Sequence, residues 1–176
     1  MLKLLVGIVI GALLGAGAFG ATAALGKEKA SPCYAPEAKD YPGDAASAGD
    51  LAKWMAAAAL RAGLPPELPV MASLVDSGLR NLPSGVGDAD SVGFFQMRAS
   101  IWNRGEYEGY PDHPELQVKW FIDHAIAVKT TRFAAGIPTD EEASFGEWIA
   151  DVERPAEQYR GRYQLRLEEA RALIVK

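Results

Sequence analysis

This sequence is poor in the side chains that most often cross-link proteins or hold metal ions. Its 176 residues include one cysteine, Cys33, and two histidines, His113 and His124. A lone cysteine cannot form a disulfide within the chain, and two separated histidines do not make a metal-ligand cluster. We therefore expect neither an internal disulfide nor a histidine-based metal centre.

An excess of positive charge is also missing. Eighteen Lys and Arg residues stand against 23 Asp and Glu residues, which gives a formal net charge of −5. Proteins that bind nucleic acids usually carry a basic patch that contacts the phosphates. The composition therefore predicts no nucleic-acid partner.

One long hydrophobic run is present, and it lies near the N-terminus. Residues 4–26 contain no charged side chain, and about 20 apolar residues suffice to span a bilayer as a helix. Two interpretations stay open: a retained anchor, which the Gly7, Gly11 and Gly15 spacing would suit, or a secretory signal with a cleavage site at Ala21–Ala23. Both predict that residues 1–26 bring the remainder of the chain to the cell envelope, outside the cytoplasm, either membrane-anchored or secreted.

A linker is expected to follow this segment. Residues 27–49 are rich in Ala, Pro, Gly, Ser and Asp and show no apolar periodicity. Cys33 lies here, and we interpret it as a free thiol. The remaining residues, 50–176, form the predicted folded domain.

Helical periodicity dominates this domain. Apolar residues recur three and four positions apart, and no stretch alternates as a strand would. The sequence therefore predicts an all-α domain of about six helices, over residues 50–62, 65–77, from near 92, 114–135, 139–152 and 155–174.

Several local features of these helices can be predicted from residue type. Asp50 is a natural N-cap for the first helix. Thr139 and Glu142 have the spacing of a capping box. We also expect a small irregular hairpin in the loop Leu79–Asp90 and a helix that begins near Val92.

The segment Met71–Leu82 carries one carboxylate in a largely apolar helix. Asp76 directly follows Val75, at the edge of the apolar face, and Gly78 is a plausible end of the helix. A carboxyl group whose pKa is raised by burial can serve as an acid and a base. The simpler interpretation, a solvated Asp at a helix end, also fits the pattern.

A second motif follows at a short distance. The order Asp76-Ser77-Gly78, then Asn81, then Ser91-Val-Gly-Phe-Phe-Gln96 resembles the soluble lytic transglycosylase domain, a lysozyme-like family that cleaves peptidoglycan. The similarity covers roughly residues 50–176 and is greatest to the actinobacterial and phage cell-wall enzymes. It implies a lysozyme-like helical fold.

The resemblance also implies a reaction and a set of site residues. The family cuts the bond between N-acetylmuramic acid and N-acetylglucosamine with one acid/base carboxyl, here Asp76, and needs neither metal nor cofactor. It places Gln96 in the glycan cleft and suggests Ser77, Phe95, Glu153 and Tyr159 as substrate-binding residues. A tyrosine near the catalytic carboxyl is a further family feature, which the sequence assigns to neither Tyr159 nor Tyr163.

The chain departs from the family at one position. The family has Glu immediately before Ser-Gly, and this sequence has Asp76, which is one methylene, about 1.5 Å, shorter. A displacement of about 1 Å can reduce a rate on the order of a hundredfold. Three hypotheses follow: a lytic transglycosylase, a module that binds peptidoglycan without cleaving it in an envelope or virion assembly, and a purely structural domain.

The loop before Gln96 has a misleading likeness to a calcium site. Asp88, Asp90 and Gly93 occupy positions 1, 3 and 6 of a calcium-loop pattern. Val92 and Ala99 then fall at positions 5 and 12, where oxygen ligands are required. We therefore expect no calcium at this loop.

Overall fold

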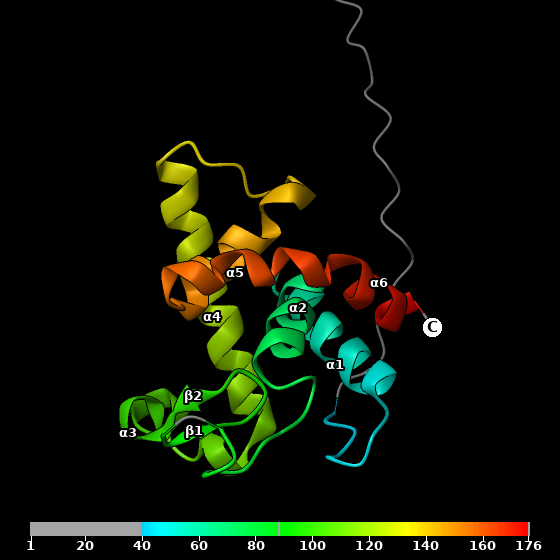
Figure 1. Cartoon of the computed structure of the whole chain (residues 1–176), viewed down its shortest axis with the longest axis vertical. Coiled ribbons are helices and arrows are strands. Elements are labelled where there is room, and N and C mark those ends of the chain that lie inside the picture. The colour runs from blue at the N-terminus through cyan, green and yellow to red at the C-terminus, as the bar shows by residue number, and fades with distance from the viewer. Residues whose placement is uncertain (1–39, 88, 176) are drawn as a thin grey trace, which may run out of the picture. The chain divides into compact units, whose positions relative to one another are not determined.

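Helices make up most of the chain that the structure describes. The structure is a computed structural model that describes residues 40–87 and 89–175 (Figure 1). Six α-helices and one two-stranded sheet lie in these ranges, in the order α1, α2, β1, β2, α3, α4, α5, α6. The predicted all-α class is confirmed at this level.

Helix α1 (Ala48–Arg61) begins two residues earlier than its apolar pattern indicates. Ser47 is the N-cap, and its Oγ accepts a hydrogen bond from the Asp50 backbone N–H at 3.1 Å. The prediction that Asp50 is the N-cap was therefore wrong. Asp50 lies in the first turn, where its carboxylate accepts a hydrogen bond from the Ser47 hydroxyl at 2.7 Å. Its negative charge there interacts favourably with the positive end of the helix dipole.

Helix α2 (Glu67–Asp76) carries the predicted carboxylate as its last residue. It follows Pro66, which suits the first turn of a helix, and most of its side chains are buried. Gly78 and Leu79 both have positive φ, +65° and +58°, and the Leu79 N–H bonds the Ser73 carbonyl at 3.2 Å. This left-handed turn ends the helix and leads the chain away from it.

The loop region folds differently from the prediction. Strands β1 (Ser91–Val92) and β2 (Met97–Arg98) pair antiparallel, with Ser91 opposite Arg98 and Val92 opposite Met97. The hairpin therefore lies beyond the predicted 79–90 loop, and no helix begins near Val92. Short apolar runs such as this one do not distinguish helix from strand by periodicity.

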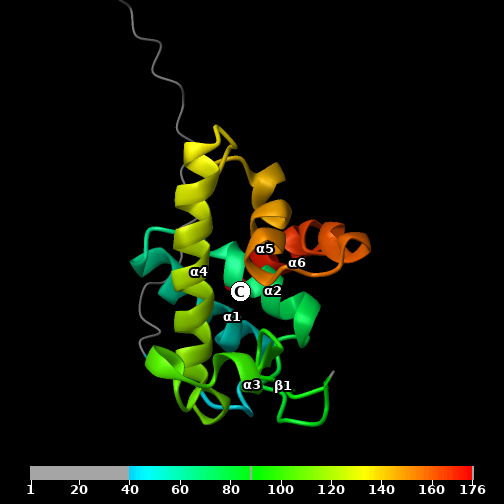
Figure 2. The same ribbon diagram turned by 90° about the vertical axis from the view of Figure 1, so that its left-hand side faces the viewer.

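Helix α4 (Pro114–Ala134) is the longest helix among the described residues and runs along one side of the domain (Figure 2). The short helix α3 (Ala99–Trp102) follows the hairpin. Pro114 begins α4, and Gly136 with φ +69° follows its end, as the sequence predicts.

Helix α5 (Phe145–Glu153) packs on α4, but its start differs from the prediction. No side-chain cap forms at Thr139 and Glu142. The Glu142 carboxylate instead pairs with Arg171 at 2.6 Å, so the expected capping box was wrong. The Glu142 side chain therefore forms a long-range ion pair in place of the local hydrogen bond that a capping box requires.

The C-terminal region is less regular than one helix from Pro155. It contains the 3₁₀ segments Glu157–Arg162 and Gln164–Arg166 before helix α6 (Leu167–Val175). Helix α6 packs against both α1 and α2. The 3₁₀ path places Tyr163 beside the end of α2.

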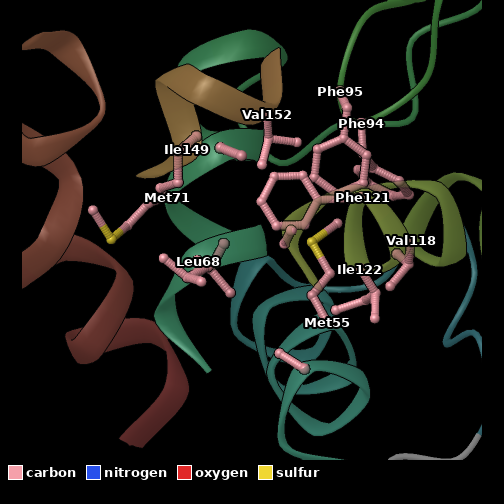
Figure 3. Close-up of a cluster of buried hydrophobic side chains, with 14 of the residues drawn as sticks. Met55, Leu68, Met71, Phe94, Phe95, Val118, Phe121, Ile122, Ile149 and Val152 are labelled. Atoms are coloured by element: carbon pink, nitrogen blue, oxygen red, sulfur yellow. The ribbon is translucent and has the colours of Figure 1, made fainter. Parts of the chain in front are cut away.

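One hydrophobic core joins these elements (Figure 3). It takes side chains from α1, α2, the hairpin loop, α4 and α5, including Met55, Leu68, Met71, Phe94, Phe95, Phe121 and Ile149. Tyr41, which precedes residue 50, also packs against it, with its ring 5.0 Å from that of Trp54. The core fixes the ends of α2 and α5, which carry the candidate site.

Within residues 40–87 and 89–175, no helix is long and apolar enough to cross a bilayer. The predicted membrane or signal segment, residues 1–26, and Cys33 lie outside the described residues.

Candidate functional site

Two carboxylates at the ends of different helices meet in this fold. Asp76 is the last residue of α2, and Glu153 is the last residue of α5. The C-terminal end of a helix carries partial negative charge, which disfavours an ionised carboxylate there. The placement of both residues therefore favours their neutral, protonated forms.

Asp76 is held by one hydrogen bond in a desolvated position. The Tyr163 hydroxyl donates to Asp76 Oδ1 at 3.2 Å, while Oδ2 is buried and has no hydrogen-bond partner among the described residues. Burial raises the pKa of Asp76 to about 8, and the bond from Tyr163 partly opposes this rise. The carboxyl group is consequently mostly protonated at neutral pH, so the solvated-Asp interpretation was wrong.

Tyr163 is the tyrosine that adjoins the carboxylate. Its side chain is 2% exposed, and burial together with the nearby Asp76 and Glu153 raises the pKa of its hydroxyl. Tyr159 lies farther out, 42% exposed, with the Arg162 guanidinium stacked 4.1 Å from its ring centre. The motif resemblance suggested Tyr159 as a substrate-binding residue, and the sequence assigned the tyrosine beside the carboxyl to neither candidate. The 3₁₀ path of the chain places Tyr163 at the carboxyl, while Tyr159 lines the hollow farther out.

Glu153 is a second buried carboxyl close to Asp76. Its Oε1 is buried and has no hydrogen-bond partner among the described residues. Burial, and after it the nearby charge of Asp76, raises the pKa of Glu153 well above its usual value. Sequence reasoning had proposed this residue only as a substrate contact.

Each of these carboxylates lines a surface hollow, and Gln96 lines both hollows. The first, which we call the Asp76 hollow, has a volume of about 450 Å³ and is lined by Asp76, Gln96, Tyr159 and Tyr163 among others. The second, the Glu153 hollow, has a volume of about 300 Å³ and is lined by Gln96, Phe95, Glu153 and His124 among others. The structure thus brings five of the six predicted site residues to adjoining hollows.

Gln96 occupies an unusual backbone conformation between the two hollows. Its φ is +48°, a left-handed value that non-glycine residues seldom adopt. Its Nε2 donates to the Gly93 carbonyl at 3.0 Å, and a Cβ on Gly87 would lie 1.8 Å from its Oε1. Such strained positions gather at functional sites, where the surrounding structure holds a side chain in place.

Two predicted contacts serve the packing of the domain. Ser77 lines neither hollow. Its buried Oγ donates a hydrogen bond to the Phe94 carbonyl at 2.8 Å. Phe95 lines the Glu153 hollow but stacks on Phe121, with ring centres 4.9 Å apart. We therefore assign Ser77 to the junction between α2 and the hairpin loop rather than to substrate.

No pattern in the sequence indicated which residue holds the hairpin loop in place. Gln117 of α4 is fully buried, and its Oε1 accepts from the Phe94 N–H at 2.9 Å. Its Nε2 donates to Asn81 Oδ1 at 3.0 Å and to the Tyr110 carbonyl at 3.2 Å. This side chain links the loop after α2 to the hairpin that carries Gln96.

The described residues contain no cluster of three metal-ligating side chains. Asp90, from the calcium-like loop, is bonded instead by Arg98 at 2.7 Å and by the Ser100 N–H at 2.6 Å. His124 Nδ1 lies 2.8 Å from the Trp120 carbonyl, as expected of a packed histidine.

The Tyr163–Asp76 bond gives a testable prediction for the titration of Asp76. The Tyr163→Phe substitution removes a donor that favours the charged carboxylate, so we expect the pKa of Asp76 to rise above 8 by about one pH unit, the equivalent of one hydrogen bond. A ¹³C NMR titration of the aspartate carboxyl carbons measures this shift. Tyr159→Phe is the matched control, and equal shifts in both variants would contradict the assignment of Tyr163.

Comparisons with protein-family models, with curated proteins and with solved structures found no match to this chain.

Proposed function

We propose that this chain is a lysozyme-like lytic transglycosylase that cleaves peptidoglycan between N-acetylmuramic acid and N-acetylglucosamine. The observation that carries the proposal is that the Asp76 carboxyl lines one hollow with Gln96 and is desolvated there, which raises its pKa to about 8. A general acid must hold its proton until the substrate arrives, and burial supplies that property here. The motif resemblance supplies the substrate class.

The proposed reaction uses Asp76 twice. Its proton first passes to the glycosidic oxygen as the bond from that oxygen to the muramic acid C1 breaks. The resulting carboxylate then takes the proton of the muramic acid C6 hydroxyl, whose oxygen bonds to C1. The products are a free 4-hydroxyl on the leaving sugar and a 1,6-anhydro end on the other, and the carboxyl is restored.

Other residues have supporting roles in this scheme. The substrate acetamido group assists at C1, in place of a second catalytic carboxylate. Gln96 offers an amide to sugar hydroxyl and acetamido groups, and Tyr163 steadies the Asp76 carboxylate through its 3.2 Å bond. Tyr159 and Phe95 line the hollows on either side of Gln96. The proposed location is the cell envelope, outside the cytoplasm, with residues 4–26 as membrane anchor or secretion signal.

The test is an analysis of products from purified peptidoglycan incubated with the full chain. We expect anhydro-muropeptides from the wild type and a loss of at least about a hundredfold with Asp76→Asn, which removes the transferable proton. Products with reducing muramic acid ends would contradict the transglycosylase chemistry. Absence of any cleavage by the wild type would contradict an enzymatic function.

A second candidate function rests on the shortened side chain at position 76. Because Asp76 reaches about 1.5 Å less far than Glu, the domain is alternatively a peptidoglycan-binding module with little or no turnover. In that case the wild type binds glycan without products, and Asp76→Glu increases turnover. Retained binding in a sedimentation assay with insoluble peptidoglycan distinguishes this candidate from a purely structural domain.

A further inference from the structure

Glu153 has no part in the one-carboxyl reaction proposed above, yet it is buried beside the reacting group. A buried carboxyl without a hydrogen-bond partner is costly, and each such group in a folded protein calls for an explanation. Two such groups occur here, because Asp76 Oδ2 and Glu153 Oε1 both lack partners among the described residues. The helices that they end, α2 and α5, are in contact, and the charge of Asp76 acts on Glu153. The inference below rests on the proposed function and extends it.

The position of Glu153 favours its neutral form. It ends α5, where the helix dipole opposes negative charge, and the following Arg154 turns the chain with φ +52°. Burial and the neighbouring Asp76 act in the same direction. When Asp76 is ionised, Glu153 therefore keeps its proton and remains a hydrogen-bond donor.

Asp76 needs a second donor at one stage of the proposed reaction. Once its proton has passed to the glycosidic oxygen, the carboxylate lies in a desolvated place with Tyr163 bonded to Oδ1 alone. The other oxygen, Oδ2, has no donor in the described structure. A donor at Oδ2 would stabilise the carboxylate during the interval before it takes the C6 hydroxyl proton.

We propose that Glu153 is a positioning residue that stays neutral through the reaction and donates its carboxyl hydrogen to Asp76 Oδ2 while Asp76 is charged. Asp76 then receives a hydrogen bond on each oxygen, from Tyr163 and from Glu153. The hydrogen stays bonded to Glu153, so Asp76 remains the only group that exchanges a proton with substrate.

The charged neighbours of the pair do not take over this role. Arg160 is bonded to Glu147 and Asp151, each at 2.7 Å, and its charge lowers the pKa of Tyr163. Arg162 and Tyr159 line the Asp76 hollow, and Arg154 and His124 line the Glu153 hollow. None of these side chains is bonded to Asp76 Oδ2 or Glu153 Oε1 in the described structure.

The experiment is a ¹³C NMR titration of the Asp and Glu side-chain carboxyl carbons in the full chain, solubilised with detergent where required. We expect Asp76 to titrate near pH 8 and Glu153 to lose its proton only after Asp76 has lost its own. With Glu153→Gln, whose amide is neutral and keeps a donor, we expect the Asp76 midpoint to stay within about half a pH unit. With Glu153→Leu, which removes the donor, we expect it to rise by about one unit.

Peptidoglycan cleavage provides the second measurement. We expect Glu153→Gln to retain activity within about threefold and Glu153→Leu to lose at least about tenfold, the equivalent of one hydrogen bond to a charged group. Glu108→Gln, at an exposed position away from both hollows, is the matched control and should change neither the titration nor the activity.

Three results would overturn the inference: ionisation of Glu153 before Asp76, a fall of the Asp76 midpoint by more than two units with Glu153→Gln, or wild-type titration and activity with Glu153→Leu. If Glu153→Leu does not fold, the wild-type and Glu153→Gln titrations decide. The titrations need no substrate, so a chain without lytic activity would contradict the proposed function and still leave this inference testable.

Discussion

We expect the Asp76→Asn chain to be more stable than the wild type at neutral pH and to lose this advantage in acid. The pKa of Asp76 is raised from 3.8 to about 8 by burial, so the folded chain must keep a proton that the unfolded chain releases. One pKa unit corresponds to about 1.4 kcal/mol, and the resulting cost to folding at pH 7 is at most about 4 kcal/mol. Asparagine is neutral in both states and avoids this cost.

The sign of the pH dependence follows from the same shift. Between about pH 4 and pH 8 the folded wild type binds more protons than the unfolded chain, so its free energy of unfolding falls as the pH rises. The difference between Asp76→Asn and wild type should therefore be near zero at pH 4 and grow to a few kcal/mol at pH 7.

Urea unfolding at a series of pH values measures this difference. Asp112→Asn, at an exposed position, is the matched control and should show no comparable trend. A gain in stability that does not vary with pH, or a loss at pH 7, would show that Asp76 is not held in its protonated form. The same variant is inactive in the proposed reaction, so stability and activity are expected to change in opposite directions.

Gln117→Leu has the largest expected loss of stability. Gln117 is fully buried and forms hydrogen bonds with the Phe94 N–H, the Tyr110 carbonyl and the Asn81 side chain. Leucine has a similar size but leaves these polar groups unsatisfied, at about 1–3 kcal/mol for each buried one. We expect the free energy of unfolding to fall by about 3–5 kcal/mol and the hairpin loop with Gln96 to lose its fixed position.

A second glutamine offers a matched comparison. Gln164 also uses both ends of its amide, accepting from the Gly146 N–H at 2.7 Å and donating to the Glu142 carbonyl at 3.1 Å, but it is only half-buried. Gln164→Leu should therefore cost less, because water can reach some of the groups it abandons. Chemical unfolding of both variants tests this order, and equal losses would contradict the role assigned to burial.

The sequence alone determined the helical class and the ends of several helices. Apolar spacing is a local property, and it correctly predicted that Asp76 ends an apolar helix and that Pro114 begins another. The lysozyme-like fold and the lytic function remain proposals that rest on the motif around Asp76 and Gln96. The prediction failed where local signals competed, as at the capping box of Glu142, whose carboxylate pairs with Arg171.

Only the tertiary structure decided the state of the site. Asp76 and Glu153 are 77 positions apart in the chain, and no periodicity indicates that the ends of α2 and α5 meet. Tyr163 adjoins Asp76 because the chain after α5 follows a 3₁₀ path, and burial among these elements keeps the Asp76 proton in place. The sequence determines which groups are present, whereas their distance and their desolvation depend on long-range packing, and these two quantities set whether a carboxyl is an acid or an anion.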